Sequence, residues 1–356
     1  MQNEISQVKA ILPALVGAGF CLFFFRSGFL TFFFLTPLGF LAFRYEHKMA
    51  WTALFFAVLG NTVFAIGNQI TRNIPLTATF LEIFYFGVMT FLFTWTIVPP
   101  SIKLPELSEK TSISALLENG AVRFIGACLL GAIMITGIFY HMTSSPRFLD
   151  YLNSLLNTLL AASHSSGANL AQIVFLENLT PEALLHGMRS VMIRGGSLVS
   201  CIVLFAACRQ ISILFARISF RINRSQSNIS LEKDSLAIFF VNPSVIWVFS
   251  ASLLLVVLTR IINLVFFEIL LWNVLVLCFI LYLAQGLGIF TFFLTRSLLS
   301  PLVKIALIVI FFVVLFSPAL NIVLFIVLFL LGVLENWVPF RASKLNGPPS
   351  TPEEGV

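Results

Sequence analysis

Ten long apolar segments follow one another along this chain of 356 residues, and they constrain its fold more than any other feature. Most of them approach the roughly 20 residues that a helix needs to cross the hydrocarbon core of a bilayer, which is about 30 Å thick. Inside that core every backbone N–H and C=O group must find its partner within the protein, and long unbroken apolar runs achieve this as α-helices. The segments are Ala10–Phe25, Gly28–Phe43, Met49–Gln69, Pro75–Val98, Gly120–His141, Gly195–Phe220, Pro243–Ile261, Phe267–Thr295, Leu302–Phe316 and Ala319–Trp337.

These segments predict an all-α, polytopic transmembrane helical bundle of about eight to ten spans, which forms a single integral membrane domain over residues 1–342. Ten is the primary count. The first two segments are separated by little more than Arg26 and the last two by Ser317-Pro318, so each pair is either a tight helical hairpin or a re-entrant element. Composition agrees with a membrane protein, because 10% of the residues are charged, against roughly 25% in soluble domains.

Lys and Arg residues fall unevenly on the two sides of a ten-span bundle. Fourteen lie on the side that holds both termini and six on the other. Cytoplasmic loops of membrane proteins carry an excess of these residues, so we expect both termini in the cytoplasm. The net charge of +6 has the same explanation, and we expect the bilayer, not a nucleic acid, as the partner.

One long connection, residues 142–194, falls on the outer side in this topology. Its first part has Phe148, Leu152, Leu155, Leu156 and Leu159 at helical spacing. Its last part begins with Thr180 as a helix N-cap, Pro181 at the first helical position and Glu182 in the first turn. The sequence therefore predicts amphipathic helices in this extracytoplasmic loop, which either cover a substrate cavity or only pack at the membrane surface. The polar, Pro-rich tail 343–356 is expected to be a disordered cytoplasmic end.

Signatures of catalysis and of metal or cofactor binding are missing from the sequence. It has no phosphate-binding loop, no H-E-x-x-H zinc motif and no G-x-S-x-G elbow. The five cysteines have no C-x-x-C spacing and fall in apolar segments, where they are expected to be small buried side chains. We therefore expect no enzyme activity, no catalytic residue, no metal and no cofactor.

Polar residues inside predicted spans are the remaining candidates for function, since such residues are costly in a membrane. Glu82 lies about two turns inside the fourth segment, and either faces a wet cavity, pairs with a cation or snorkels to the interface. Glu335 lies near a span end, where solvation at the interface suffices. Candidate binding or helix-packing residues are Glu82, Asn273, Tyr282, Gln285 and Gly286.

The stretch around Gln285 favours a packing role over a binding role. Tyr282, Gln285 and Gly286 share one helix face, where the tyrosine could bond the amide and the glycine lets another helix approach. In the first segment, Ala14 and Ala18 form a small-residue face on which a membrane protein partner could dock.

The last third of the chain resembles the bacterial membrane-protein family typified by YybS. The motifs are "FVNPSVIWVFS" (240–250), "NVLVLCFILYLAQGLGIFTFFL" (273–294) and "GVLENWVPFR" (332–341), and "LTPEALLHGMRSVMIRG" (179–195) is similar to the stretch before the family's central span. Glu335 stands where the family has Asp. The matching residues are Pro243, Trp247, Asn273, Tyr282, Gln285, Gly286, Gly332, Trp337, Phe340 and Arg341.

The resemblance implies the bacterial inner membrane and a likeness in architecture to the S components of energy-coupling-factor transporters and to MreD, a cell-shape protein. It therefore favours a small-molecule-binding transport component that works with a membrane partner. The alternative is a non-transporting scaffold in envelope assembly. The first predicts a polar-lined pocket beside Glu82 or Gln285, and the second predicts amides bonded from helix to helix.

Overall fold

The computed structural model describes residues 2–45, 47–72, 74–98, 120–165, 174, 176–223, 239–262, 264–296, 300–317, 320–338 and 340–341. Within these ranges the chain is helical, with turns and no strand, as predicted for an all-α fold. The helices are α1 Gln2–Arg26, η1 Phe29–Phe33, α2 Thr36–Arg44, α3 His47–Arg72, α4 Leu76–Ile97, α6 Gly120–Thr143, α7 Pro146–Ser165, α9 Pro181–Val191, η2 Met192–Gly196, α10 Ser197–Asn223, α11 Val245–Ile262, α12 Val265–Arg296, α13 Pro301–Phe316 and α14 Leu320–Leu334.

Each predicted apolar segment coincides with one or more helices, but ten separate spans are more than the helix lengths support. Among the described residues, five helices are long and apolar enough to cross a membrane, namely α3, α4, α6, the continuous stretch Pro181–Ser219 and α12. The pair α13 and α14 adds a sixth if it counts as one span bent by 117°. With nine residues, α2 is only about 14 Å long, less than half the thickness of the hydrocarbon core. Hydropathy finds the apolar residues correctly, but it does not find the places where the chain turns.

The chain divides into two compact units, Met1–Ser227 and Asn228–Val356, where the sequence predicts one membrane domain. The division falls in the polar stretch RINRSQSNISLEKDS. Residues 224–238 and the tail 343–356 lie outside the described residues, so the predicted disorder of the tail stays a prediction.

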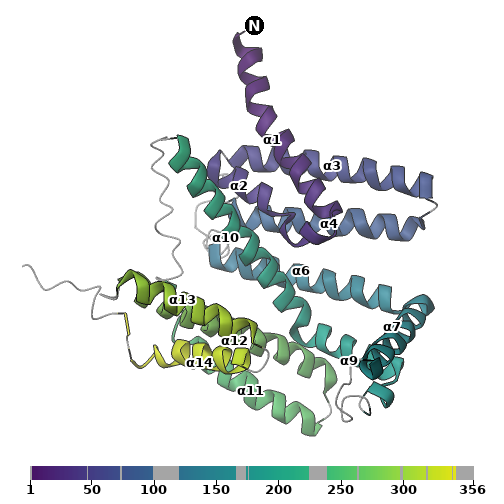
Figure 1. Cartoon of the computed structure of the whole chain (residues 1–356), viewed down its shortest axis with the longest axis vertical. Helices are drawn as coiled ribbons and strands as arrows, with labels where there is room; N and C mark the ends of the chain where they lie inside the picture. Colours follow the sequence, from purple (N-terminus) through teal and green to yellow (C-terminus); the bar gives the residue numbers. More distant parts are fainter. Residues whose placement is uncertain are drawn as a thin grey trace, which may run out of the picture. The chain divides into compact units, whose positions relative to one another are not determined.

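Unit 1 is built around α3, α4 and α6, which pack side by side in this order. The connection from α3 to α4 is short, so these two helices are antiparallel. Helix α1 crosses α3, and α10 packs against α2 and α6 (Figure 1). Gly131 of α6 permits the close approach of α10, because a Cβ there would lie 2.8 Å from Sγ of Cys201.

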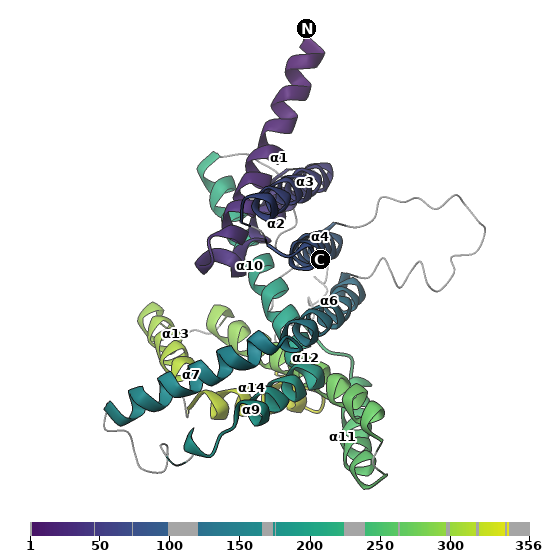
Figure 2. The same ribbon diagram turned by 90° about the vertical axis from the view of Figure 1, so that its right-hand side faces the viewer.

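Two further helices, α7 and α9, follow α6 in the long connection for which the sequence predicts amphipathic helices. Thr180 is the N-cap of α9, and its side chain accepts a hydrogen bond from the N–H of Ala183 at 3.2 Å. Leu152 and Leu156 of α7 are buried, whereas Leu155 and Leu159 are exposed. In Figure 2, where α3 and α4 are seen end-on, α7 lies below them with its axis at a steep angle to theirs.

Helix α9 is tied to its neighbours near its C-terminal end. At its C-terminal end the chain passes through η2 into α10, and Gly195 has a φ of 132°, which other residues rarely adopt. Near the same end, Arg189 donates hydrogen bonds to the carbonyl oxygen of Thr143 (2.7 Å) and to its side-chain oxygen (3.0 Å). The guanidinium also lies 4.7 Å from the ring centre of Tyr140, so α9 is tied to the C-terminal end of α6.

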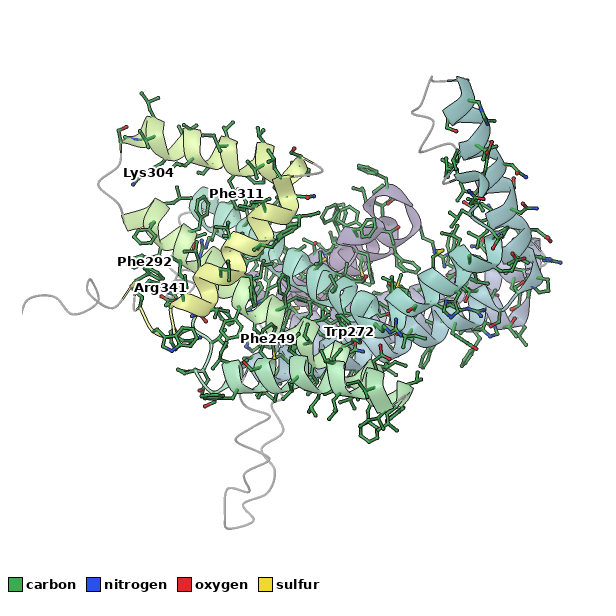
Figure 3. The ribbon with its side chains drawn as sticks, turned by 90° about the horizontal axis from the view of Figure 1, so that it is seen from below. Phe249, Trp272, Phe292, Lys304, Phe311 and Arg341 are labelled. Carbon is green, nitrogen blue, oxygen red and sulfur yellow. The ribbon has the colours of Figure 1, made fainter. Side chains whose placement is uncertain are left out.

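Unit 2 is centred on α12, which packs against both α11 and α14. Phe249 of α11 lies 5.4 Å from Phe329, measured between ring centres. Phe311 of α13 lies 4.9 Å from Phe290 in the same measure, and Figure 3 labels Phe249 and Phe311. Helices α12 and α14 cross at two glycines. A Cβ on Gly286 would lie 1.9 Å from the carbonyl oxygen of Leu328, and one on Gly332 would lie 2.0 Å from that of Tyr282.

Candidate functional site

The charge that the sequence places inside the fourth segment is paired in the structure. Glu82 of α4 forms an ion pair with Arg26, which ends α1. The same guanidinium donates a hydrogen bond of 2.9 Å from Nη2 to Oδ1 of Asn61 in α3. Arg26, Asn61 and Glu82, here called the Arg26 cluster, thus join three helices of unit 1.

Two members of the Arg26 cluster lie away from the ends of their helices. A helix rises 1.5 Å per residue, which places Asn61 about 16 Å from the end of α3 and Glu82 about 9 Å from the start of α4. A lone charge at the centre of a bilayer costs about 2.5–3.5 kcal/mol on the insertion scale. Of the three explanations that the sequence leaves open for Glu82, the structure shows pairing with a cation.

The Arg26 cluster is only partly closed. The side chains of Arg26 and Glu82 are 25% and 32% exposed, whereas Asn61 is 1% exposed. Phe64 lies against the guanidinium, with its ring centre 4.5 Å from the central carbon. Two buried donors, Nε of Arg26 and Nδ2 of Asn61, have no hydrogen-bond partner among the described residues. A buried donor without a partner costs about 1–3 kcal/mol, so the cluster can gain from a ligand that supplies acceptors.

A groove between α1 and α3 leads to this cluster. Its volume is about 420 Å³, and Phe64 is one of its lining residues. A second groove of about 480 Å³ lies between α1, α2 and α10, and a third of about 430 Å³ lies between the start of α4 and His141 of α6. Neither Glu82 nor Gln285 lines any of these three grooves, so none of the three is the polar-lined pocket that the transport interpretation predicts beside these residues.

In unit 2 the predicted residue Gln285 lies in a buried polar network. Its Nε2 donates to Oε2 of Glu335 at 3.0 Å, and its Oε1 accepts from the backbone N–H of Val241 at 2.9 Å. Arg341 donates to both carboxylate oxygens of Glu335, with 2.6 Å between Nε and Oε1. It also donates to the carbonyl oxygen of Phe239 at 2.9 Å. Gln285, Glu335 and Arg341, the Glu335 network, hold four segments of unit 2 together.

This geometry corrects one interpretation and sharpens another. Glu335 ends its helix but is 4% exposed, so an ion pair and not interfacial water satisfies it. Gln285 is 0% exposed and bonds Glu335 and a backbone amide, not the tyrosine one turn earlier. Tyr282 instead packs edge-on against Phe329 of α14, with 6.1 Å between ring centres.

The other predicted residues lie in different environments. Gly286 permits the crossing of α12 and α14 described above, as expected for a packing residue. Asn273 lies more than two turns from Gln285 along α12 and donates to the carbonyl oxygen of Ile269 in its own helix at 2.9 Å. It therefore does not join the Glu335 network.

Ala14 and Ala18 are 0% and 3% exposed. They lie on α1, which packs against α3 and α2, so their small side chains already serve packing inside unit 1. Docking of a partner protein on these two residues has no support in the structure.

The sequence interpretation missed Arg26 and Asn61 as a pair, and Arg341 as the partner of Glu335. Arg26 was treated as a loop cation between two apolar segments. The position of Arg26 between two apolar segments was the sequence signal for this ion pair. A single cation whose only polar neighbour is a serine needs a counter-ion from elsewhere in the chain. Among the described residues, no three His, Cys, Asp or Glu side chains gather where they could hold a metal ion.

Comparisons with protein-family models, with characterised proteins and with solved structures gave no match for this chain. The resemblance to the YybS-like family therefore stays a prediction.

Proposed function

We propose that this chain is a multi-pass protein of the bacterial inner membrane that binds a small molecule at the Arg26 cluster, as the membrane-embedded component of a transport system. The observation that carries the proposal is the pair of buried donors on Arg26 and Asn61, beside an ion pair that is partly exposed. Structural ion pairs in apolar surroundings are best fully satisfied, and unfilled donors at such a site favour a ligand.

The proposal includes a topology. Both termini lie in the cytoplasm, in agreement with the distribution of Lys and Arg. Helices α7 and α9 then lie at the outer face, and the steep angle between α7 and the α3–α4 pair supports a position along the membrane surface. His141 and Leu81 line one groove together, so this end of α6 lies beside the first turns of α4, not far from Glu82.

Native mass spectrometry of the full chain, purified in mild detergent, tests the binding role. We expect a retained small molecule on the wild-type protein and its loss in the variants Arg26→Met and Asn61→Leu. The matched control is Asn68→Leu on the same helix, two turns beyond Asn61 and outside the cluster, which should retain the molecule. Equal retention in all four proteins, or none in the wild type after reconstitution with bacterial lipids and metabolite extract, would refute the proposal.

A scaffold in envelope assembly is the second candidate, and the Glu335 network favours it. The scaffold interpretation predicts amides bonded from helix to helix, and Gln285 is bonded in this way. A scaffold needs no ligand, so it predicts that Arg26→Met and Asn61→Leu leave the set of co-purifying small molecules unchanged, while envelope-assembly proteins are recovered with every variant.

A further inference from the structure

We infer that the groove between α1 and α3, with the Arg26 cluster at its end, binds an uncharged single-chain amphiphile whose head group carries oxygen acceptors. This inference rests on the proposed function, because it names the ligand class of the same site. It follows from three features of unit 1: the shape and lining of the groove, the donors at its end and the charge of the cluster.

The groove is suited to an alkyl or isoprenoid chain. Its lining is apolar, and it includes the small residues Ala18, Gly19 and Gly60, of which Ala18 is buried and Gly60 lies against Leu22. A Cβ added to Gly19 would meet no atom within 4 Å, so this part of the groove is open. A volume of about 420 Å³ lies within the range of small-molecule sites.

The groove and the cluster are continuous. Leu22 lines the groove and lies one helical turn before Arg26 on α1. Phe64 of α3 also lines the groove, and its ring centre lies 4.5 Å from the central carbon of the Arg26 guanidinium. A molecule that fills the groove with its chain therefore has its other end beside Phe64 and Arg26, next to the cluster that holds the two donors without partners.

Charge decides the class of head group. The positive charge of Arg26 is already balanced by Glu82, so the cluster is neutral as a whole. A carboxylate or phosphate would leave an uncompensated negative charge between the helices, which is unfavourable in apolar surroundings. Hydroxyl, ester or ketone oxygens accept from Nε of Arg26 and Nδ2 of Asn61 without adding charge. The fitting ligand is therefore neutral, like a monoacylglycerol or an isoprenoid with an oxygenated head.

Photolabelling of the full chain in lipid nanodiscs tests this inference. The probe is monopalmitoylglycerol with a diazirine in its acyl chain, and labelled residues are mapped by mass spectrometry. We expect labels on α1 and α3 around the groove. Unlabelled monopalmitoylglycerol should compete with the probe at least about tenfold better than palmitate or palmitoyl lysophosphatidylglycerol does. A modest difference in binding free energy is enough to give this factor.

Two glycine variants separate a specific site from general contact with lipid. Gly19→Leu fills the groove, and should lower the labelling about tenfold or more. Gly137→Leu on α6 is the matched control, because Gly137 is also exposed and has open space around its Cα, but lies outside the groove. Asn61→Leu removes one donor and should weaken competition by about two- to tenfold.

Better competition by palmitate or by the lysophospholipid overturns the neutral head group, and labelling unchanged by Gly19→Leu overturns the groove. In either case the proposed function survives if Arg26→Met still removes the molecule that the purified wild-type protein retains. The proposed function fails as well if Arg26→Met and Asn61→Leu bind that molecule as well as the wild-type protein does.

Discussion

Removal of the Arg341 side-chain charge tests the Glu335 network most directly. In Arg341→Met the carboxylate of Glu335 stays buried at 4% exposure, with the amide of Gln285 as its remaining neutral donor. Loss of one partner of a buried ion pair typically costs about 3–5 kcal/mol, because an uncompensated charge is left inside. The carbonyl oxygen of Phe239 also loses its donor. We therefore expect the free energy of unfolding of unit 2 to fall by about 3–5 kcal/mol.

The chain provides its own reporter for this measurement. All five cysteines are free and buried, and Cys278 is the one that lies in unit 2. With Cys21, Cys128, Cys201 and Cys208 replaced by alanine, a thiol-reactive fluorophore reports the exposure of Cys278 alone. Denaturant titration in detergent then gives the free energy of unfolding for each variant on this background.

A second substitution separates the effect of charge from that of packing. In the double variant Arg341→Met with Glu335→Gln, no buried charge is left, and the new amide can still accept from Gln285. We expect this variant to be about 1–3 kcal/mol less stable than the wild type, and so more stable than Arg341→Met alone. The uncompensated charge is not the cause of the loss if the free energy of unfolding of Arg341→Met lies within about 1 kcal/mol of the wild type. The same conclusion follows if the double variant is no more stable than Arg341→Met.

Three further predictions concern helix contacts. Gly286→Ala places a methyl group against the carbonyl oxygen of Leu328, so α12 and α14 must separate, and the Cys278 assay should show a loss of about 1–3 kcal/mol. Arg189→Met removes the bonds to Thr143, and hydrogen exchange of the α9 amides should rise at least about tenfold while that of α3 stays unchanged. Gly195→Ala forces a φ of 132° on a residue with a side chain, and thermal unfolding should show a loss of about 1–3 kcal/mol in stability. The control Gly126→Ala, where a Cβ meets open space, should show no loss.

The sequence predicts the local features of this fold well. The cap at Thr180 is confirmed, because N-capping depends on residues only two or three positions apart. The burial of the five cysteines is confirmed for a similar reason, since apolar segments bury their small side chains. The helical state of each apolar segment follows from hydrogen-bonding requirements that any apolar stretch shares.

The sequence predicts much less about the sites. Arg26 is 35 residues from Asn61 and 56 from Glu82, and Gln285 is 50 residues from Glu335. Periodicity along one helix says which residues share a face, but not which other helix that face meets. For the same reason the partner of Gln285 was sought on its own helix, in Tyr282, although it lies at the end of α14.

The distance along the chain between Arg26 and Glu82 also has a consequence for biosynthesis. Ribosomes add about 5–20 residues per second, so roughly 3–11 seconds pass between the synthesis of Arg26 and that of Glu82. During this interval the cation at the end of α1 has no counter-ion. Helix α1 therefore completes its contacts only after α4 has been made, although α2 and α3 are synthesised in between.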